Sequence, residues 1–322
     1  VVAALERAAK HGKYVTAIVE LKARFDEARN IEWAREMERA GVQVIYGIHG
    51  LKTHAKICII VRREPQGIVR YMHFGTGNYN EATAKLYSDV SLLTCDDAFG
   101  QDASAFFNAV TGASQPRTMQ ELAAAPTTMR RKIMDLIEGE TRRSLQGQKG
   151  RITAKLNALV DTQVIDALYR ASQAGVTIRL NVRGQCCLKP GLNGLSETIE
   201  VVSIVDRFLE HARVLSFRQG GDERVFISSA DWMPRNLDRR VELLIPVKDR
   251  ASIARLTSIL ETYFQDNTQS WRMLDSGEYK RIESKERRVR AQEILYERSR
   301  TAWDEAESSR RATFRPIRAG ES

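Results

Sequence analysis

The sequence predicts an α/β fold made of two duplicated domains, in which mixed sheets are flanked by helices. Apolar, β-branched runs alternate along the chain with segments of helical periodicity, and this alternation is typical of α/β domains. One order of motifs occurs twice in the chain. The length of 322 residues and the hydrophobic content of 43% suit two globular domains and argue against a disordered chain.

The duplication is visible in matched segments. The first copy contains LERAAKHGKYVTAIVELKAR, HAKICIIV and HFGTGNYN, and the second contains LYRASQAGVTIRLNVRG, HARVLSF and VFISSADW. The separation between equivalent residues shrinks slowly along the chain, as small loop deletions would make it. The equivalent pairs are Arg7 and Arg170, Arg24 and Arg183, His54 and His211, and Asn78 and Asp231.

In the first copy we expect helices over 1–11, 30–41 and 97–112. Apolar residues recur on one face of these segments, and a glycine stands at the end of each. The second helix is expected to begin with Asn30 as its N-cap. The segments VTAIVEL, VQVIYGI, HAKICIIV and RYMHFGTG are predicted to be strands because they are rich in β-branched and aromatic residues.

The pattern weakens between two prolines, Pro116 and Pro126, so we place the domain boundary there. Residues 1–121 form the first predicted domain, and residues 122–322 form the second, which ends in a basic helical tail. In the second domain TTMRRKIMDLIEGETRRSL, VIDALYRASQAG and ASIARLTSILETYFQD are predicted helices, while VTIRLNVRG, IEVVSIV, ARVLSF and RVFISSA are predicted strands. QGQKGRITAKLNALVD is interpreted as a Gly- and Lys-rich loop.

The composition limits the possible functions. The net charge of +9 favours polyanionic partners, although charge alone does not choose among nucleic acid, polyphosphate, nucleotides and acidic lipid. No apolar run approaches the roughly 20 residues needed to span a bilayer. We see no secretory signal, and Val1 within an apparent helix suggests the start of a fragment. The four cysteines lack a Cys-x-x-Cys pair, which favours reduced thiols in a cytosolic protein.

Phosphate-binding loops of the common kinds are missing from the sequence. It contains neither the GxxxxGK[ST] pattern of a P-loop nor the GxGxxG pattern of a dinucleotide-binding turn. The segment GTGNYN has two glycines but lacks the third. If the protein handles phosphate, it uses other groups.

The strongest candidates for chemistry are the two equivalent histidines. In the strand HAKICIIV, His54 and Lys56 share a face, and His211 with Arg213 repeats the arrangement. A neutral imidazole is a competent nucleophile, and a neighbouring cation stabilises a phosphoryl group during its transfer. A single histidine of this kind is more often structural, but the repetition with matched neighbours favours a function for both.

Further candidates surround these histidines. Arg24 and Arg183 each follow a strand near its carboxyl end, where a guanidinium can bind phosphate through two hydrogen bonds; the alternative is a surface ion pair. Asn78 can donate an amide hydrogen bond beside His54. Tyr87 can stack on a base, bind a phosphate or pack in the core. A last set either lines a polyanion path or belongs to a flexible basic loop: Lys149, Arg151 and Lys155.

The repeated His-x-Lys with a small, polar Asn turn resembles the phospholipase-D-like fold, in which two copies meet to form one phosphoryl-transfer site. The HxKxxxxD motif of that fold expects an acidic residue at Val61, and the second copy has Arg213 in place of lysine. The sequence therefore leaves the orientation of His54 unexplained.

Longer strings resemble the polyphosphate kinase family from residue 1 to about residue 300: VELKARFDEARNIEWA, GLKTHAKICII, GTGNYNEATAKLYSD, RFLEHARV and ISSADWMPRN. The resemblance implies reversible transfer of the γ-phosphoryl group of ATP to inorganic polyphosphate through a phosphohistidine intermediate, with Mg²⁺ as cofactor. It covers the two related C-terminal domains of the family and leaves out its N-terminal and head domains.

The resemblance also implies roles for individual residues. His54 matches the phosphorylated histidine, and His211 matches the second histidine, which belongs to the ATP site and can act as a general acid. Tyr87 and Arg183 match nucleotide-phosphate contacts, to which we add Lys56 and Asn78 as ATP- or phosphate-binding candidates. Arg24 matches an arginine of the magnesium site. Because a guanidinium has no lone pair for a metal, we interpret Arg24 as a phosphate contact beside Mg²⁺.

For the full-length protein we expect a homo-oligomer that works in the cytoplasm, or peripherally at the inner face of the membrane, on ATP, ADP and inorganic polyphosphate. No nucleic-acid partner is expected. Two alternatives stay open. A phospholipase-D-like phosphodiesterase or nuclease would cleave diesters without ATP or metal. A non-catalytic polyanion-binding fragment would bind polyphosphate or nucleic acid with strong salt dependence.

Overall fold

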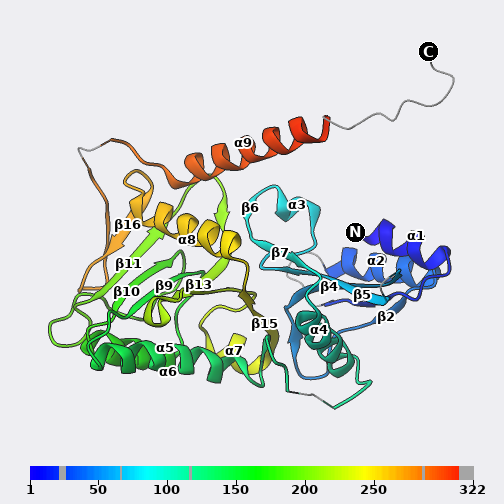
Figure 1. Cartoon of the computed structure of the whole chain (residues 1–322), viewed down its shortest axis with the longest axis horizontal. Helices are drawn as coiled ribbons and strands as arrows, with labels where there is room; N and C mark the ends of the chain where they lie inside the picture. Colours follow the sequence, from blue (N-terminus) through cyan, green and yellow to red (C-terminus); the bar gives the residue numbers. More distant parts are fainter. Residues whose placement is uncertain (22–26, 66, 116–117, 285–286, 312–322) are drawn as a thin grey trace.

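The computed structural model describes residues 1–21, 27–65, 67–115, 118–284 and 287–311, apart from the side chains of 309–311. Strands and helices alternate along the chain, and helices flank mixed sheets (Figure 1). The predicted α/β class is therefore confirmed. Within the described residues, every helix is too short or too polar to span a lipid bilayer.

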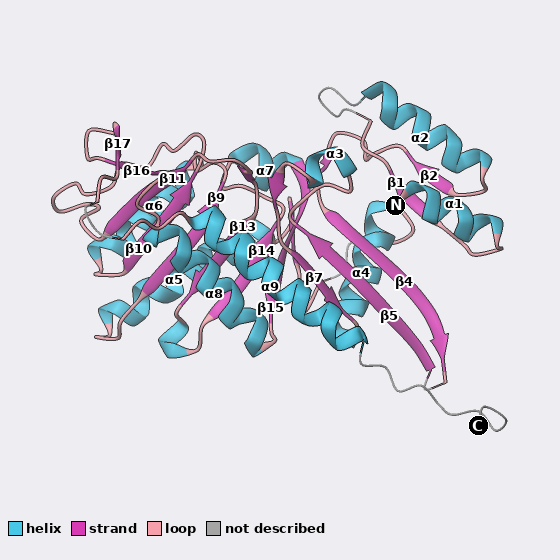
Figure 2. Cartoon of the chain, turned by 90° about the horizontal axis from the view of Figure 1, so that it is seen from above, coloured by secondary structure: helices cyan, strands magenta, loops and turns pink. Residues whose placement is uncertain are grey.

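The first copy follows the predicted order of elements. Its helices are α1 (Val2–Lys10), α2 (Glu27–Arg39), α3 (Glu81–Ala84) and α4 (Asp97–Val110). Its strands are β1 (Thr16–Ile18), β2 (Gln43–Ile45), β3 (Lys52–Thr53), β4 (Lys56–Glu64), β5 (Gly67–Gly75), β6 (Tyr87–Ser88) and β7 (Ser91–Thr94). In Figure 2, β4 and β5 form a long hairpin that runs away from the second copy.

The second copy is larger. Its helices are α5 (Met129–Leu145), α6 (Thr162–Gln173), α7 (Pro234–Arg239), α8 (Arg250–Gln265) and α9 (Ala291–Arg311), with a 3₁₀ turn at Gln219–Gly221. Its strands are β8 (Ala123–Ala125), β9 (Arg151–Leu156), β10 (Thr177–Val182), β11 (Ile199–Ile204), β12 (Leu209–Glu210), β13 (Arg213–Phe217), β14 (Arg224–Ser228), β15 (Arg240–Val247), β16 (Ser270–Met273) and β17 (Tyr279–Arg281).

One large sheet organises the second copy. Its strands lie in the order β17-β16-β11-β10-β9-β13-β14-β15-β3, and β8 also pairs with β15. The parallel pair β9–β10 and the antiparallel pair β9–β13 make this sheet mixed. In the first copy, the described strands form a separate β1–β2 pair and a separate β4–β5–β7 sheet.

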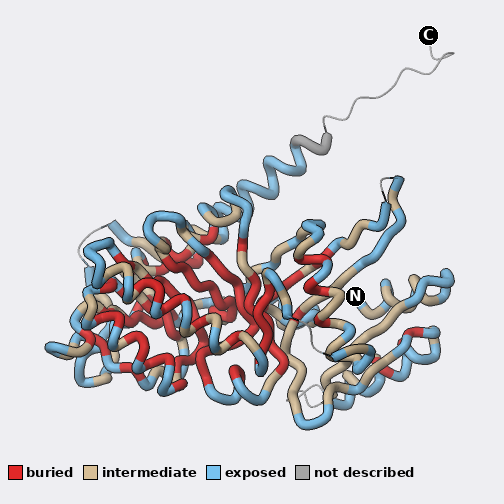
Figure 3. Tube along the Cα trace, turned by 60° about the horizontal axis from the view of Figure 1, so that its bottom comes forward, coloured by how far each residue is buried: buried red, intermediate tan, exposed pale blue. Residues whose placement is uncertain are grey.

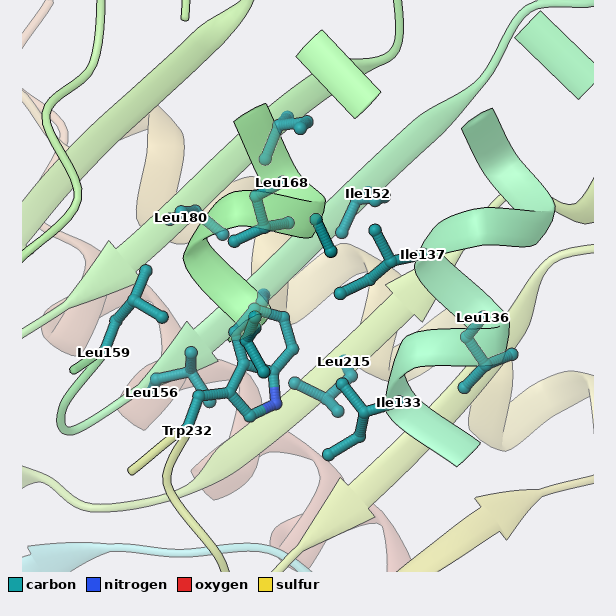
Figure 4. Packing of buried hydrophobic residues seen from close by; sticks show 14 of the residues in the cluster. Ile133, Leu136, Ile137, Ile152, Leu156, Leu159, Leu168, Leu180, Leu215 and Trp232 are labelled. Carbon is teal, nitrogen blue, oxygen red and sulfur yellow. The ribbon is translucent and has the colours of Figure 1, made fainter. Parts of the chain in front are cut away.

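Two hydrophobic clusters hold the molecule together. In the first, α5 and α6 cover one face of the large sheet, and Leu168, Ile137 and Trp232 are almost completely buried there (Figure 4). In the second, α8 covers the opposite face, and Leu260 of α8 belongs to the same cluster as Phe99 of α4. This second cluster joins the copies, which agrees with the buried region at their junction in Figure 3.

Two predictions about local structure were wrong. The segment expected to be a loop contains β9, which is buried from Ile152 to Leu156 at the centre of the sheet. Lys155 obscured the strand pattern, because a charged residue usually indicates exposure to solvent. Here its charge is balanced by Glu210 at 3.1 Å. Asn30 is not an N-cap, since α2 already begins at Glu27; the side chain of Asn30 donates to the carbonyl of Glu20.

Candidate active site

Two short strand pairings between the copies place the equivalent histidines. The strand β3, which leads to His54, runs parallel to the start of β15 in the second copy. The strand β12, which leads to His211, runs parallel to β6 in the first copy. The backbone N–H of His54 donates to the carbonyl of Val241 at 2.9 Å, and that of His211 donates to the carbonyl of Ser88 at 3.2 Å. Both histidines therefore lie at the junction of the copies.

A carboxylate from the opposite copy holds each imidazole ring. The Nδ1 atom of His54 lies 2.9 Å from Oε2 of Glu242, and Nδ1 of His211 lies 2.8 Å from Oδ1 of Asp89. Because a carboxylate accepts hydrogen bonds, it fixes the proton of a neutral ring on Nδ1. The Nε2 atom of His54 then carries the lone pair and is the nucleophilic nitrogen of the ring.

A hydroxyl group supports each carboxylate. Ser229 Oγ donates to Glu242 Oε2 at 2.5 Å, and Thr76 Oγ1 donates to Asp89 Oδ1 at 2.7 Å. Glu242, Ser229 and Thr76 are completely buried. At each histidine a hydroxyl, a carboxylate and an imidazole thus form a hydrogen-bonded chain. The two chains are related by the duplication.

Sequence reasoning missed both carboxylates. It looked for the acid of the motif at Val61, whose side chain is 57% exposed on β4. The available signal was the repeat itself: Asp89 and Glu242 are separated by the same number of residues as Asn78 and Asp231. Glu242 accounts for the orientation of His54 that the motif left unexplained.

The basic residue two positions after each histidine turns back toward it, so the expected neighbours do lie together. Lys56 Nζ donates to the carbonyl of His54 at 2.5 Å. Arg213 Nη1 donates to the carbonyl of His211 at 2.9 Å and lies 3.2 Å from its Nε2 atom. Asp231 balances the buried Arg213 through a 2.9 Å ion pair. Two cations are thereby placed beside the two rings.

Burial makes the lysine and the two histidines of the site harder to protonate. It lowers the pKa of Lys56 to about 7, although Glu242 opposes the shift. It also lowers the pKa of His54, with a further contribution from the Lys56 charge. Burial lowers the pKa of His211 as well, against the hydrogen bond to Asp89. Burial alone would raise the pKa of Asp89, but His211, Thr76 and Arg213 together lower it. Both imidazoles are therefore neutral, and Asp89 is ionised, near neutral pH.

Tyr87 and Arg183 lie close to His211, as their proposed roles require. The ring of Tyr87 is 5.0 Å from the imidazole of His211, measured between centroids. Arg183 Nε donates to Asn157 Oδ1 at 2.6 Å and to the carbonyl of Glu210 at 2.8 Å. These bonds fix the guanidinium and do not use its two Nη atoms.

The remaining candidates differ in their surroundings. Asn78 is exposed, whereas its equivalent Asp231 is buried. Arg24, the candidate neighbour of the metal, lies outside the described residues. Of the three basic residues assigned either to a polyanion path or to a flexible basic loop, Lys155 is buried against Glu210, and Arg151 forms an ion pair with Glu223 at 2.5 Å.

The described residues do not form a cage for a metal ion. Among them, no group of three or more His, Cys, Asp or Glu side chains is placed to hold one. Asp89 pairs with His211 and Asp231 pairs with Arg213, while Oε1 of Glu242 is buried without a hydrogen-bond partner among the described residues, 3.9 Å from Nη1 of Arg240. A Mg²⁺ ion therefore does not fit the protein groups described in this part of the chain.

Comparison with known proteins shows two matched domains in this chain. Residues 1–116 match the family model of polyphosphate kinase C-terminal domain 1, and residues 122–292 match that of C-terminal domain 2. The chain is 69% identical over 321 residues to a polyphosphate kinase of Rhodopirellula baltica, and 52% identical over 279 residues to one of Synechocystis sp.. These alignments cover 98% and 87% of this chain, but 38% of each relative.

A solved structure is also similar. The crystal structure of polyphosphate kinase from Porphyromonas gingivalis matches with a TM-score of 0.87 and 40% sequence identity, over 94% of this chain and 46% of that one. The chain thus spans less than half the length of these relatives. Through its two matched domains, the chain belongs to the polyphosphate kinase family.

Proposed function

We propose that this chain is the catalytic region of a polyphosphate kinase, which reversibly transfers the γ-phosphoryl group of ATP to inorganic polyphosphate through a phosphohistidine at His54. The observation that carries the proposal is the pair of reciprocal histidine–carboxylate contacts, His54 with Glu242 and His211 with Asp89. Residues 1–121 and 122–322 are the two domains of this region. The full-length protein is a cytoplasmic homo-oligomer, or lies peripherally at the membrane.

In the first step, Nε2 of His54 attacks the γ-phosphorus in line. The N–P bond forms while the bond from the γ-phosphorus to the bridging oxygen breaks, and ADP leaves. The ring becomes a phosphoimidazolium, and Glu242 stabilises its positive charge through Nδ1–H. Lys56 and Arg183 offset the negative charge on the phosphoryl oxygens.

His211 assists the leaving oxygen. It is neutral in the free protein, but the negative charge of a bound triphosphate raises the pKa of a neighbouring imidazole and favours the acid form. In the second step the terminal phosphate of polyphosphate attacks the phosphorus on His54. The N–P bond breaks, and the chain grows by one unit. Mg²⁺ is the proposed cofactor; it would offset phosphate charge during the transfer, and Arg24 would contact phosphate beside it.

The test is whether His54 becomes phosphorylated. The chain, and a longer form restoring the full length of its relatives, are incubated with Mg²⁺ and γ-labelled ATP, and the label is tested for acid lability and base stability. The exposed His49 provides a matched control. Label that is lost in His54→Ala, kept in His49→Ala and transferred to polyphosphate supports the proposal.

The longer form also decides the alternatives. If it is natively folded and takes up no label, the proposal is wrong, and diester cleavage or polyanion binding should be assayed instead. If only the longer form is labelled, the catalytic role of His54 holds, and the shorter chain lacks groups that hold the nucleotide.

A further inference from the structure

A buried polar cluster lies next to His211, and the mechanism above does not use it. We call it the Glu210 cluster; it consists of Glu210, Lys155, Ser88, Gln292 and Tyr263, whose buried side chain is hydrogen-bonded to Glu210 and Ser88. Glu210 Oε2 lies 3.1 Å from Lys155 Nζ and accepts a hydrogen bond from Ser88 Oγ at 3.1 Å. Glu210 Oε1 accepts from Gln292 Nε2 at 2.8 Å. Glu210, Lys155 and Gln292 are at least nine-tenths buried, so these bonds have no competition from solvent.

The cluster reaches the backbone on both sides of the histidine. Three consecutive carbonyls accept side-chain hydrogen bonds: that of Glu210 from Arg183, that of His211 from Arg213, and that of Ala212 from Lys155 at 3.0 Å. Lys155 thus links the side chain of Glu210, before the histidine, to the backbone after it. The position of His211 depends on this cluster as well as on its strand pairing.

The same cluster reaches the partner of His211 in the first copy. Ser88 immediately precedes Asp89, whose carboxylate holds the imidazole. The side chain of Glu210 therefore connects the residue before His211 to the residue before Asp89. A shift of the Glu210 carboxylate changes the alignment of the imidazole with its carboxylate.

Gln292 attaches the C-terminal helix to this cluster. It lies in the first turn of α9 and also forms two hydrogen bonds of 2.8 Å with the backbone of Phe208, one as donor and one as acceptor. The start of the helix is fixed by Asp266, which accepts from the backbone N–H of Ala291 at 2.7 Å, and by Arg290, whose Nε donates to Asp206 at 2.9 Å. In Figure 1 the helix then runs past α8 and away from the body.

We propose that Gln292 is a positioning residue for His211: through Glu210 it couples helix α9 to the alignment of the histidine with Asp89. The catalytic consequence of this coupling rests on the proposed function, whereas the coupling itself is a property of the folded chain. The match to the family model ends at residue 292, so the rest of α9 lies beyond the matched domain. The last matched residue, Gln292, is the one that contacts Glu210.

The test measures the titration of the histidine rings by NMR in the chain as it stands. Gln292→Met keeps the size of the side chain and removes its hydrogen bonds. Because the bond to Asp89 raises the pKa of His211, a loosened contact should lower that pKa and weaken the Nδ1–H signal, while His54 titrates as before. The control is Arg298→Met, since Arg298 binds Ser258 and Thr262 of α8 without touching Glu210.

The proposal is overturned if the His211 titration is unchanged in Gln292→Met, or if Arg298→Met changes it equally. If Gln292→Met does not fold, Gln292→Asn serves instead: it keeps an uncharged amide but is one methylene shorter, so it cannot bind Phe208 and Glu210 together. The same fall in the His211 pKa is expected, and an unchanged pKa contradicts the coupling.

A kinetic measurement separates this inference from the proposed function. In the form of the protein that takes up label, Gln292→Met should lower kcat about tenfold, a typical cost for a residue one step removed from a site, and leave KM for ATP unchanged. If the wild type is never labelled, the proposed function fails while the NMR result still stands. If the wild type is labelled and Gln292→Met behaves like Arg298→Met, only the coupling fails.

Discussion

The Nδ1 atom of His54 lies 2.9 Å from Oε2 of Glu242, a carboxylate that belongs to the other copy and is completely buried. A buried carboxylate without a partner is costly, so this contact orients the imidazole and also gives the carboxylate a hydrogen-bond donor. Lys56, beside the same ring, and Arg240, 3.9 Å from Oε1 of Glu242, are the positive groups that act on this carboxylate. The histidine, the carboxylate and the lysine therefore depend on one another.

Glu242→Gln should slow the phosphorylation of His54 by on the order of 10²-fold, because the amide keeps the shape of the side chain but not the charge that stabilises the phosphoimidazolium. Single-turnover uptake of labelled phosphate measures the rate. Glu200→Gln is a suitable control, since Glu200 pairs with Arg272 on the outer strands of the sheet. An unchanged rate in Glu242→Gln would show that the charge of this carboxylate is dispensable.

The pH dependence of phosphorylation should reflect the low pKa of His54. Only the neutral ring is a nucleophile, and burial together with the Lys56 charge keeps the pKa of His54 below its usual value. The acid limb of the rate profile should therefore lie below about pH 6.5, and a second fall is expected above about pH 7, where Lys56 loses its proton. Lys56→Met removes a charge that lowers the pKa of His54, so the acid limb should move to higher pH. An acid limb at the same pH in both proteins would contradict this account.

Lys56 should make stability rise with pH in a definite window. Its pKa is about 7 in the folded protein and near 10.5 when unfolded, so between these values the unfolded chain binds more protons. The free energy of unfolding then increases with pH across the window and levels off above it. In Lys56→Met this dependence is absent, and the variant should gain most over the wild type at or below pH 7. Urea unfolding at several pH values tests this; parallel curves would refute it.

Arg183→Lys should weaken ATP binding. The Nε atom of Arg183 already holds Asn157 and the carbonyl of Glu210, and its two Nη atoms are left for phosphate oxygens. A lysine has a single nitrogen and cannot do both, so KM for ATP should rise about tenfold with a smaller change in kcat. Arg170→Lys, on helix α6, is the control. Equal KM values in Arg183→Lys and the wild type would exclude Arg183 from the nucleotide site.

The pairing of the histidines with basic neighbours could be predicted because it is local and occurs twice. His54 with Lys56 and His211 with Arg213 each lie within three residues of sequence. The carboxylates could not be found in this way, since Glu242 follows His54 by more than a hundred residues and reaches it only through the pairing of β3 with β15. A local motif contains no signal for such a contact.

The buried strand β9 was hidden for a related reason. Lys155 carries a charge that usually indicates solvent exposure, and the ion pair that makes its burial tolerable depends on Glu210, far along the chain. Asn78 and its equivalent by sequence, Asp231, differ in burial, since Asn78 is exposed and Asp231 is buried.

The reciprocal contacts bear on how such a chain could arise. One copy alone would have a histidine without its carboxylate and a carboxylate without its histidine, and two identical copies related by a twofold axis would satisfy both at once. The arrangement is thus that of a homodimer whose subunits have been fused. After fusion each pair could diverge separately: one site now has glutamate supported by serine, and the other has aspartate supported by threonine. The two histidines are therefore equivalent in position but unequal in the groups that support them.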